Sequence, residues 1–393
     1  MAREADTLVP AGPVIVPLVL AAVVEPFAWA LALIPGTLGG AWYGRSSLLV
    51  AVHSLTVGVA AMAILGASWQ LVPVITARAW RPPARGLTIA FLASLPAFLY
   101  GFSVPGLVGT LAAAGIVSVL LVRSVLVLWA LATAEGRGVT RAWLVAAELS
   151  LLTGLFVATA LWAGRLGYPS FSDPIAAVGL HVRLLLGGWV GGSIVGYGSV
   201  LLPMFVIGRE PSARALALAW ALWFGAVVSG SVWLGAAAAL LVAGVLGATL
   251  LTGVRGPLVQ PLFGFVGLGL AGVGLVLGRG DVVVACAICL FALPVVRGMT
   301  LKIAPYLLWA QIRPDAPVPP LPVLATVQAG VSAVGAGALV AGLDLAQPVV
   351  TAVGAAVLLV GALVHAAVLA TILARVGLTS LRTGAIPGTE STS

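Results

Sequence analysis

The stretch that decides the fold is residues 47–76, SLLVAVHSLTVGVAAMAILGASWQLVPVIT, which contains no Asp, Glu, Lys or Arg. As an α-helix it would extend about 45 Å at about 1.5 Å per residue, more than the roughly 30 Å of hydrocarbon in a bilayer. The apolar residues run continuously rather than alternating with polar ones, which is typical of a transmembrane helix and not of a membrane β-strand.

Similar apolar runs recur along the whole chain. Of its 393 residues, 61% are hydrophobic and only 8% are charged, whereas soluble domains contain roughly 25% charged residues. The 49 glycines suit close helix packing in lipid. We therefore expect an all-α polytopic membrane protein, embedded in the lipid bilayer, with about twelve transmembrane helices. The expected helices cover residues 13–33, 47–76, 87–104, 107–134, 140–163, 174–207, 212–229, 231–252, 257–278, 282–311, 322–345 and 347–376.

No loop is long enough to fold by itself, so we expect one membrane domain over residues 1–393, with 383–393 as a disordered tail. Arg residues in the short loops predict the orientation. With the N-terminus inside, twelve lie in cytoplasmic segments and three in outer loops. This predicts a plasma-membrane protein with both termini in the cytoplasm. Although the net charge is +8, the Arg residues occur singly and do not indicate a nucleic-acid partner.

The second, sixth and tenth expected helices end with the same spacing, a glycine followed seven residues later by a proline. The pairs are Gly66 and Pro73, Gly196 and Pro203, and Gly298 and Pro305. Each pair lies at the expected cytoplasmic end of a long helix, and the pattern returns every four helices. We therefore predict three four-helix units, at about 13–134, 140–252 and 257–376, with the three long helices at the centre.

Histidines mark two of these long helices. His53 precedes Gly66, and His181 precedes Gly196, by nearly the same separation along the chain, so both are expected at similar depth in the outer half of the membrane. Each is either a metal or haem ligand or a buried histidine bonded to neighbouring groups. The tenth helix has no histidine there and contains Cys286 and Cys289, which we interpret as packing residues rather than as a metal or redox pair.

The topology and these motifs resemble the catalytic subunit of haem-copper oxidases and nitric oxide reductases. The phrases HSLTVGVAAMAILGASWQLVPVI, HVRLLLGGWVGGSIVGYGSVLLPMF and GMTLKIAPYLLW also resemble uncharacterised membrane proteins of that superfamily and its nitric-oxide-response (NnrS) relatives. The resemblance implies that His53 matches the haem ligand of helix two and that His181 matches the metal ligand of helix six. It covers the chain in topology but only about 70 residues in motif.

The number of histidines limits what the resemblance can carry over. The chain has 3 histidines, and none lies in the seventh or tenth helix, where the oxidases have further ligands. An oxygen-reducing centre with two haems and a copper needs about six. We expect one b-type haem at most, with His53 as the first candidate ligand and His181 as the next, the other axial position being open or held by a weak ligand. Copper is not expected. His365, alone in the twelfth helix, is interpreted as a packing residue.

Charged side chains inside the membrane are candidates for function. Arg123 and Glu148 are expected to pair, either as a structural ion pair or as part of an ion or proton path. Arg183 either binds a haem propionate or reaches the outer headgroups. Glu25, which precedes Pro26, is expected to lie capped at a helix kink.

Three functions follow from these residues. The first is a haem-copper-oxidase-like protein with one haem, acting in electron transfer, in nitric oxide binding or in assembly with other membrane subunits. The second is a transporter or channel for a small molecule, lined by Arg123, Glu148 and His365. The third is a metal-free accessory subunit that retains the oxidase fold.

Overall fold

The computed structural model describes residues 11–34, 37, 46–78, 80–134, 138–207, 210–253, 258–312 and 322–382. Every regular element in these ranges is helical, which confirms the predicted all-α class. Eleven of these helices are long and apolar enough to cross a membrane, and a shorter apolar helix has 17 residues. The predicted tail at 383–393 lies outside the described residues. The first unit comprises α2 (Ala11–Ala32), α3 (Ser46–Leu55), η1 (Thr56–Ala61), α4 (Met62–Thr76), α5 (Ala84–Ser103) and α6 (Leu107–Ala132).

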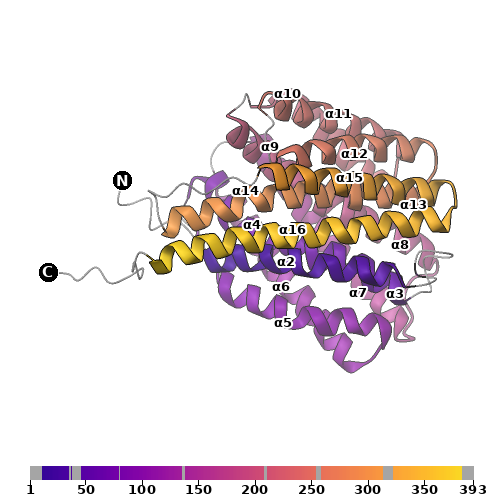
Figure 1. Ribbon diagram of the computed structural model, residues 1–393. Coiled ribbons are helices and arrows are strands. Elements are labelled where there is room, and N and C mark those ends of the chain that lie inside the picture. Colours follow the sequence, from indigo (N-terminus) through magenta and orange to yellow (C-terminus); the bar gives the residue numbers. More distant parts are fainter. Residues whose placement is uncertain are drawn as a thin grey trace.

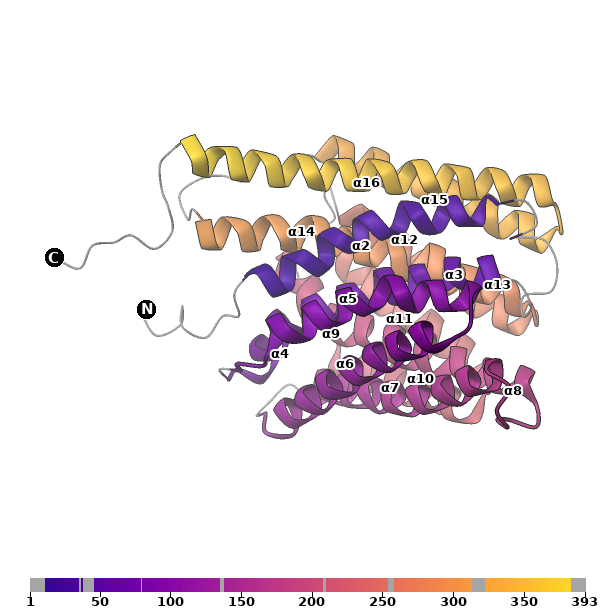
Figure 2. The same cartoon turned by 90° about the horizontal axis from the view of Figure 1, so that it is seen from below.

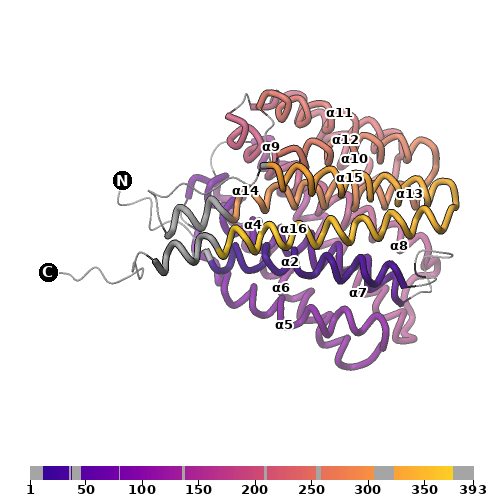
Figure 3. The backbone as a smooth tube through the Cα atoms, in the orientation of Figure 1, coloured from indigo at the N-terminus to yellow at the C-terminus, as the bar shows by residue number. Residues whose placement is uncertain are grey.

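The second and third units contain the same number of segments. The second comprises α7 (Gly138–Arg165), α8 (Pro174–Val182), η2 (Arg183–Gly191), α9 (Gly192–Val206), α10 (Ala213–Ser229) and α11 (Val232–Leu251). The third comprises α12 (Val259–Val276), α13 (Gly280–Ala285), η4 (Cys286–Ala292), α14 (Leu293–Ile312), α15 (Pro322–Asp344) and α16 (Pro348–Arg382). The helices run side by side along one common direction (Figure 3).

The three long helices lie at the centre, as predicted. Their apolar stretches are 72% buried in Ser46–Thr76, 78% in Pro174–Val206 and 72% in Gly280–Ala304, whereas those of the other spanning helices are 39–50% buried. In each central helix the middle segment is a π-helix: η1, η2 and η4. These segments end five, five and six residues before Gly66, Gly196 and Gly298. These π-helices were not predicted from the sequence.

The same packing scheme occurs in all three units. The first helix of a unit packs on its central helix, the third packs on the fourth, and the fourth packs on the central helix. The fourth helix also contacts the first helix of the next unit, since α6 packs on α7, α11 on α12 and α16 on α2. The helices of the described ranges therefore close a ring around η1, η2 and η4. This scheme agrees with the predicted repeat, and an exact rotation between the units stays a prediction.

The two ends of the bundle differ in what they carry. At one end α3, α8 and α13 begin, and at the other α4, α9 and α14 end (Figure 1). We call the first the histidine end, because His53 and His181 lie near it. From below, α16 lies at one edge near α2 and α14, and α6 and α7 lie towards the opposite edge (Figure 2). Which end faces the cytoplasm is inferred from the Arg distribution alone and stays a prediction.

The repeated glycine has a packing role in the first unit. A Cβ atom on Gly66 would lie 2.8 Å from the Val14 carbonyl oxygen, closer than carbon and oxygen atoms pack. This lack of a side chain lets α4 contact α2, where it packs against the ring of Pro17. Small residues have this function in membrane helices generally, because hydrophobic burial does not drive one helix onto another in lipid.

Candidate functional site

The two histidines lie at the same depth in neighbouring units. His53 is seven residues after the first residue of α3, and His181 is seven residues after the first residue of α8. The start of α8 is fixed by Asp173, whose side chain accepts hydrogen bonds from the backbone N–H groups of Ile175 and Ala176. The prediction of similar depth is confirmed, because the two imidazole rings are neighbours.

The rings of His53 and His181 have centroids 6.4 Å apart and planes inclined by 29°. His53 Nδ1 lies 2.8 Å from the carbonyl oxygen of Leu49. Because a carbonyl only accepts, Nδ1 carries the proton and Nε2 keeps a free lone pair. His181 forms a hydrogen bond with the Gly154 backbone, and its buried Nδ1 has no partner among the described residues. Each ring thus keeps one nitrogen available for a ligand.

An aromatic wall surrounds this pair. The Phe102 ring stacks on His53 at 4.2 Å, and Phe98 meets His53 edge-on at 6.0 Å. Trp162 packs against both phenylalanines and donates from Nε1 to the Thr110 hydroxyl at 3.2 Å. Aromatic rings from α5 and α7 therefore pack around the first histidine, and the Thr110 hydroxyl of α6 holds the Trp162 indole.

The pair supplies two imidazole donors, the number that a haem iron takes from protein. A metal-bound imidazole nitrogen lies about 2 Å from the metal, so the centres of two axial rings lie roughly 6 Å apart. The observed 6.4 Å is close to that spacing. Among the described residues, no group of three or more His, Cys, Asp or Glu could hold a metal ion. The donor set is therefore two imidazoles, which suffices for haem iron.

The predicted contact of Arg183 with a haem propionate stays a prediction. The exposed Arg183 side chain packs on Gly230 at the end of α10, where Nη1 occupies the space that a Cβ atom would need. Gly230 has φ +72°, in the left-handed region that ends helices. A cation at this place faces the negative end of the α10 dipole. Arg165 lies beside the aromatic wall: its guanidinium is over the Phe102 ring at 5.7 Å and donates to the Phe102 carbonyl at 3.0 Å.

Arg123 and Glu148 form a fully buried ion pair. Arg123 Nη1 lies 2.5 Å from Glu148 Oε1, and both side chains are 0% exposed. The guanidinium also donates to the Ser68 hydroxyl at 3.3 Å and to the Tyr197 hydroxyl at 3.4 Å. Glu148 Oε2 has no partner among the described residues. The pair that the sequence suggested is therefore formed, and it joins α6 of the first unit to α7 of the second.

Glu25 is not capped at a helix kink, as the sequence suggested, but paired with Arg297 of the third unit. Nε of Arg297 donates to Glu25 Oε2 at 3.0 Å, and Nη2 pairs with Oε1. Trp29 Nε1 also donates to Oε1, at 3.3 Å. Arg297 is 1% exposed and was missed, although it stands alone in the apolar run FALPVVRGM. The rule applied to Arg123, that a charge inside a membrane helix is significant, would have found it.

More polar groups extend this second ion pair. Arg297 Nη1 donates to the Ser332 hydroxyl at 2.5 Å, and Gln328 Nε2 donates to the same hydroxyl at 3.0 Å. Gln260 donates in turn to Gln328. His365 is buried within electrostatic range of Glu25 and Arg297, and its Nδ1 has no partner among the described residues. The interpretation of His365 as a packing residue stays a prediction.

In comparisons with known proteins, no family model matches the chain and no curated protein matches it. The assignment of function therefore rests on the side chains described above.

Proposed function

We propose that this membrane protein binds one b-type haem between His53 and His181 and uses it in one-electron transfer. The observation that carries the proposal is the pairing of two histidines from two units, 6.4 Å apart, each with a free ring nitrogen. The proposal differs from the haem-copper oxidases in one respect. The residue of the oxidases that corresponds to His181 binds a separate metal, whereas here His181 would bind the same haem as His53.

The proposed role follows from the coordination. His53 and His181 would hold the haem, which would supply a one-electron iron couple. The Leu49 carbonyl would hold the His53 ring in its orientation, in the way that outer-shell partners of metal-bound histidines do. Phe98, Phe102 and Trp162 would keep water from the site. The two histidines lie seven residues after the first residues of α3 and α8, so the site would be close to one end of the bundle, where a redox partner or another membrane subunit could reach it.

The experiment is haem analysis of protein purified from cells supplied with haem. We expect one haem per chain by pyridine haemochrome assay and a low-spin spectrum typical of two axial histidines. His53→Ala and His181→Ala should each lose most of the bound haem. His365→Ala is the matched control, because it removes a buried histidine outside the pair and should keep the haem.

Two results would contradict the proposal. One is a colourless protein under haem supply, which favours the accessory subunit or the transporter. The other is full haem content in the His53→Ala, His181→Ala double variant, which would place the haem elsewhere. A five-coordinate spectrum that changes with nitric oxide would keep the haem but replace electron transfer by gas binding.

A second candidate function is proton or small-solute transport, because the polar groups around the two ion pairs are incompletely satisfied. Glu148 Oε2, Gln260 Oε1 and His365 Nδ1 are buried without a partner among the described residues. Unpaired polar atoms at such depth are costly and mark paths through membranes. Proton flux into dye-loaded proteoliposomes tests this function. Flux that Glu148→Gln and His365→Ala leave unchanged would remove both residues from the path.

A further inference from the structure

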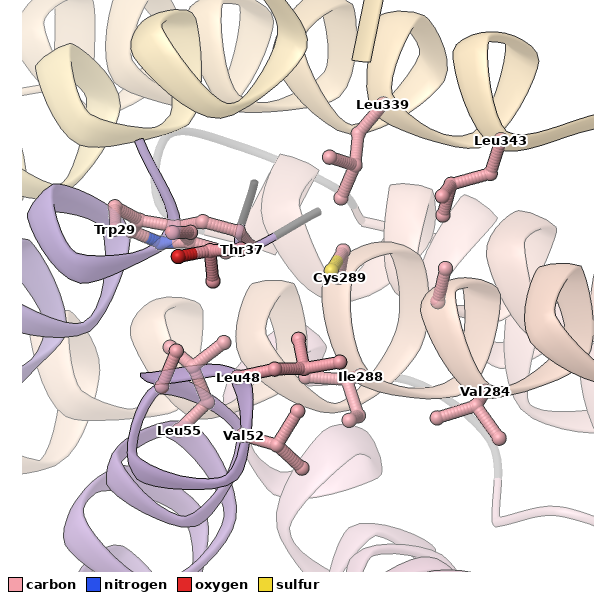
Figure 4. A pocket seen from close by; sticks show the side chains of 13 residues that line it. Trp29, Thr37, Leu48, Val52, Leu55, Val284, Ile288, Cys289, Leu339 and Leu343 are labelled. Carbon is pink, nitrogen blue, oxygen red and sulfur yellow. The ribbon is translucent and has the colours of Figure 1, made fainter. Parts of the chain in front are cut away.

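A small cavity lies near the histidine end, between the first and third units. Its volume is about 60 Å³, and it is bounded by α2, α3, the α13–η4 segment and α15. Figure 4 shows the labelled side chains converging on it from these helices. The wall includes Trp29, Leu55, Ile288, Cys289 and Leu339. None of these residues belongs to the aromatic wall around His53.

The lining is almost entirely apolar. Thr37 supplies one hydroxyl, but its Oγ1 already bonds the Ser47 hydroxyl at 3.0 Å. The Trp29 Nε1 group is already bonded to Glu25. The remaining polar atom is the Cys289 sulfur, which is a weak partner. A buried water needs two to four polar partners, so this lining favours an apolar occupant.

The cavity occupies the third-unit counterpart of the histidine positions. His53 lies 13 residues before Gly66, and His181 lies 15 residues before Gly196. The same separations before Gly298 of the third unit correspond to Ala285 and Val283. Ala285 lines the cavity together with its neighbour Val284 and with Ile288 and Cys289 of the π-helix η4. Segments of π-helix are frequent at functional sites because the extra residue per turn alters the local packing. The first and second units have a histidine at this position, whereas the third unit has an apolar cavity.

We infer that this cavity is a binding site for a small, uncharged, apolar molecule. A water molecule needs roughly 10–15 Å³ of such space, so the cavity admits about four heavy atoms. A charged ligand is excluded, because the ion pair nearest to the cavity, Glu25 with Arg297, is neutral as a whole and Trp29 separates it from the space. The site is independent of haem binding at His53 and His181.

Xenon is the probe, and two native cysteines supply the readout in the purified, full-length protein. Cys289 lines the cavity, whereas Cys286, three residues earlier, packs in a separate cluster with Ala271 and Val282. We expect neutral iodomethane, which is small enough to enter the cavity, to alkylate Cys289. Xenon under pressure should slow the alkylation of Cys289 and leave that of Cys286 unchanged. Iodoacetate, which carries a negative charge, should leave Cys289 unmodified.

A substitution that fills the cavity provides a second, independent test. Ala51→Phe fills the cavity from α3 and should remove both the alkylation of Cys289 and the xenon effect. The xenon protection needs no substitution, so it tests the inference even if this variant fails to fold. Fast reaction of Cys289 with iodoacetate, or no effect of xenon on its alkylation, would each overturn the inference. Loss of haem has no bearing on any of these measurements.

Discussion

Arg297 and Glu25, 272 residues apart in sequence, join the third unit to the first through a two-point contact between guanidinium and carboxylate. The contact lies where α14 and α16 pack on α2, the junction that closes the ring of helices. The Arg123–Glu148 pair lies at the junction of the first and second units. No described Arg–Glu pair lies where α11 meets α12. Two of the three junctions are thus held by a buried ion pair.

Removing one partner of the Glu25–Arg297 pair should strongly destabilise the protein. Arg297→Leu leaves Glu25 as an uncompensated buried charge, and breaking a buried pair in this way costs about 3–5 kcal/mol. The double variant Glu25→Leu, Arg297→Leu removes both charges and should recover much of that loss. Thermal unfolding in one detergent measures all three proteins. A double variant as unstable as Arg297→Leu would contradict this account.

Substitutions of the two residues that contact Arg123, Glu148 and Tyr197, should lower the stability of the protein by different amounts. Glu148→Gln removes the charge that faces a fully buried guanidinium, so we expect a loss of about 3 kcal/mol or more. Tyr197→Phe removes only a 3.4 Å hydrogen bond and should cost about 1 kcal/mol. Tyr100→Phe, on the exposed face of α5, is the matched control and should be neutral. Equal losses in the free energy of unfolding for Glu148→Gln and Tyr197→Phe would show that the ion pair stabilises the protein no more than the tyrosine hydrogen bond does.

Much of the architecture could be predicted because it depends on local composition. Length and apolarity are enough to indicate the membrane-spanning helices. They do not indicate which helices are central, since Pro348–Ala374 is as apolar as the central helices and only 39% buried; the repeated glycine–proline spacing predicted that. The π-helices have no comparable signal. They depend on how η1, η2 and η4 contact one another at the centre, and no single helix contains that information.

The site could be predicted only in part, for a similar reason. The spacing of His53 and His181 from their glycines predicts that the two rings lie at the same level of the bundle, which the structure confirms. It does not give the rotation of each helix, which decides that the rings face each other. Glu25 and Arg297 could not be paired from sequence, because the first and third units meet only when the ring of helices closes. Arg297 itself could have been identified from its apolar surroundings.

The repeated glycine should tolerate no side chain. Gly66→Ala would place a Cβ atom 2.8 Å from the backbone oxygen of Val14, so α4 and α2 must separate, at a cost of about 1–3 kcal/mol. Gly247→Ala on α11 is the matched control, since no atom lies within 4 Å of the added carbon. It should be neutral or stabilising by up to about 1 kcal/mol, because alanine favours helix. Similar melting temperatures for the two variants would refute the close-approach role.

Orientation can be tested with two single cysteines in a Cys286→Ala, Cys289→Ala background. Ser170 lies exposed in the segment between α7 and α8 at the histidine end, and Glu210 lies exposed between α9 and α10 at the other end. The excess of Arg residues predicts that the second end faces the cytoplasm, because positively charged loops are retained there. A membrane-impermeant maleimide should therefore label Ser170→Cys in intact cells and Glu210→Cys only after the membrane is opened. The reverse pattern would place both histidines on the cytoplasmic side and direct the search for a redox partner there.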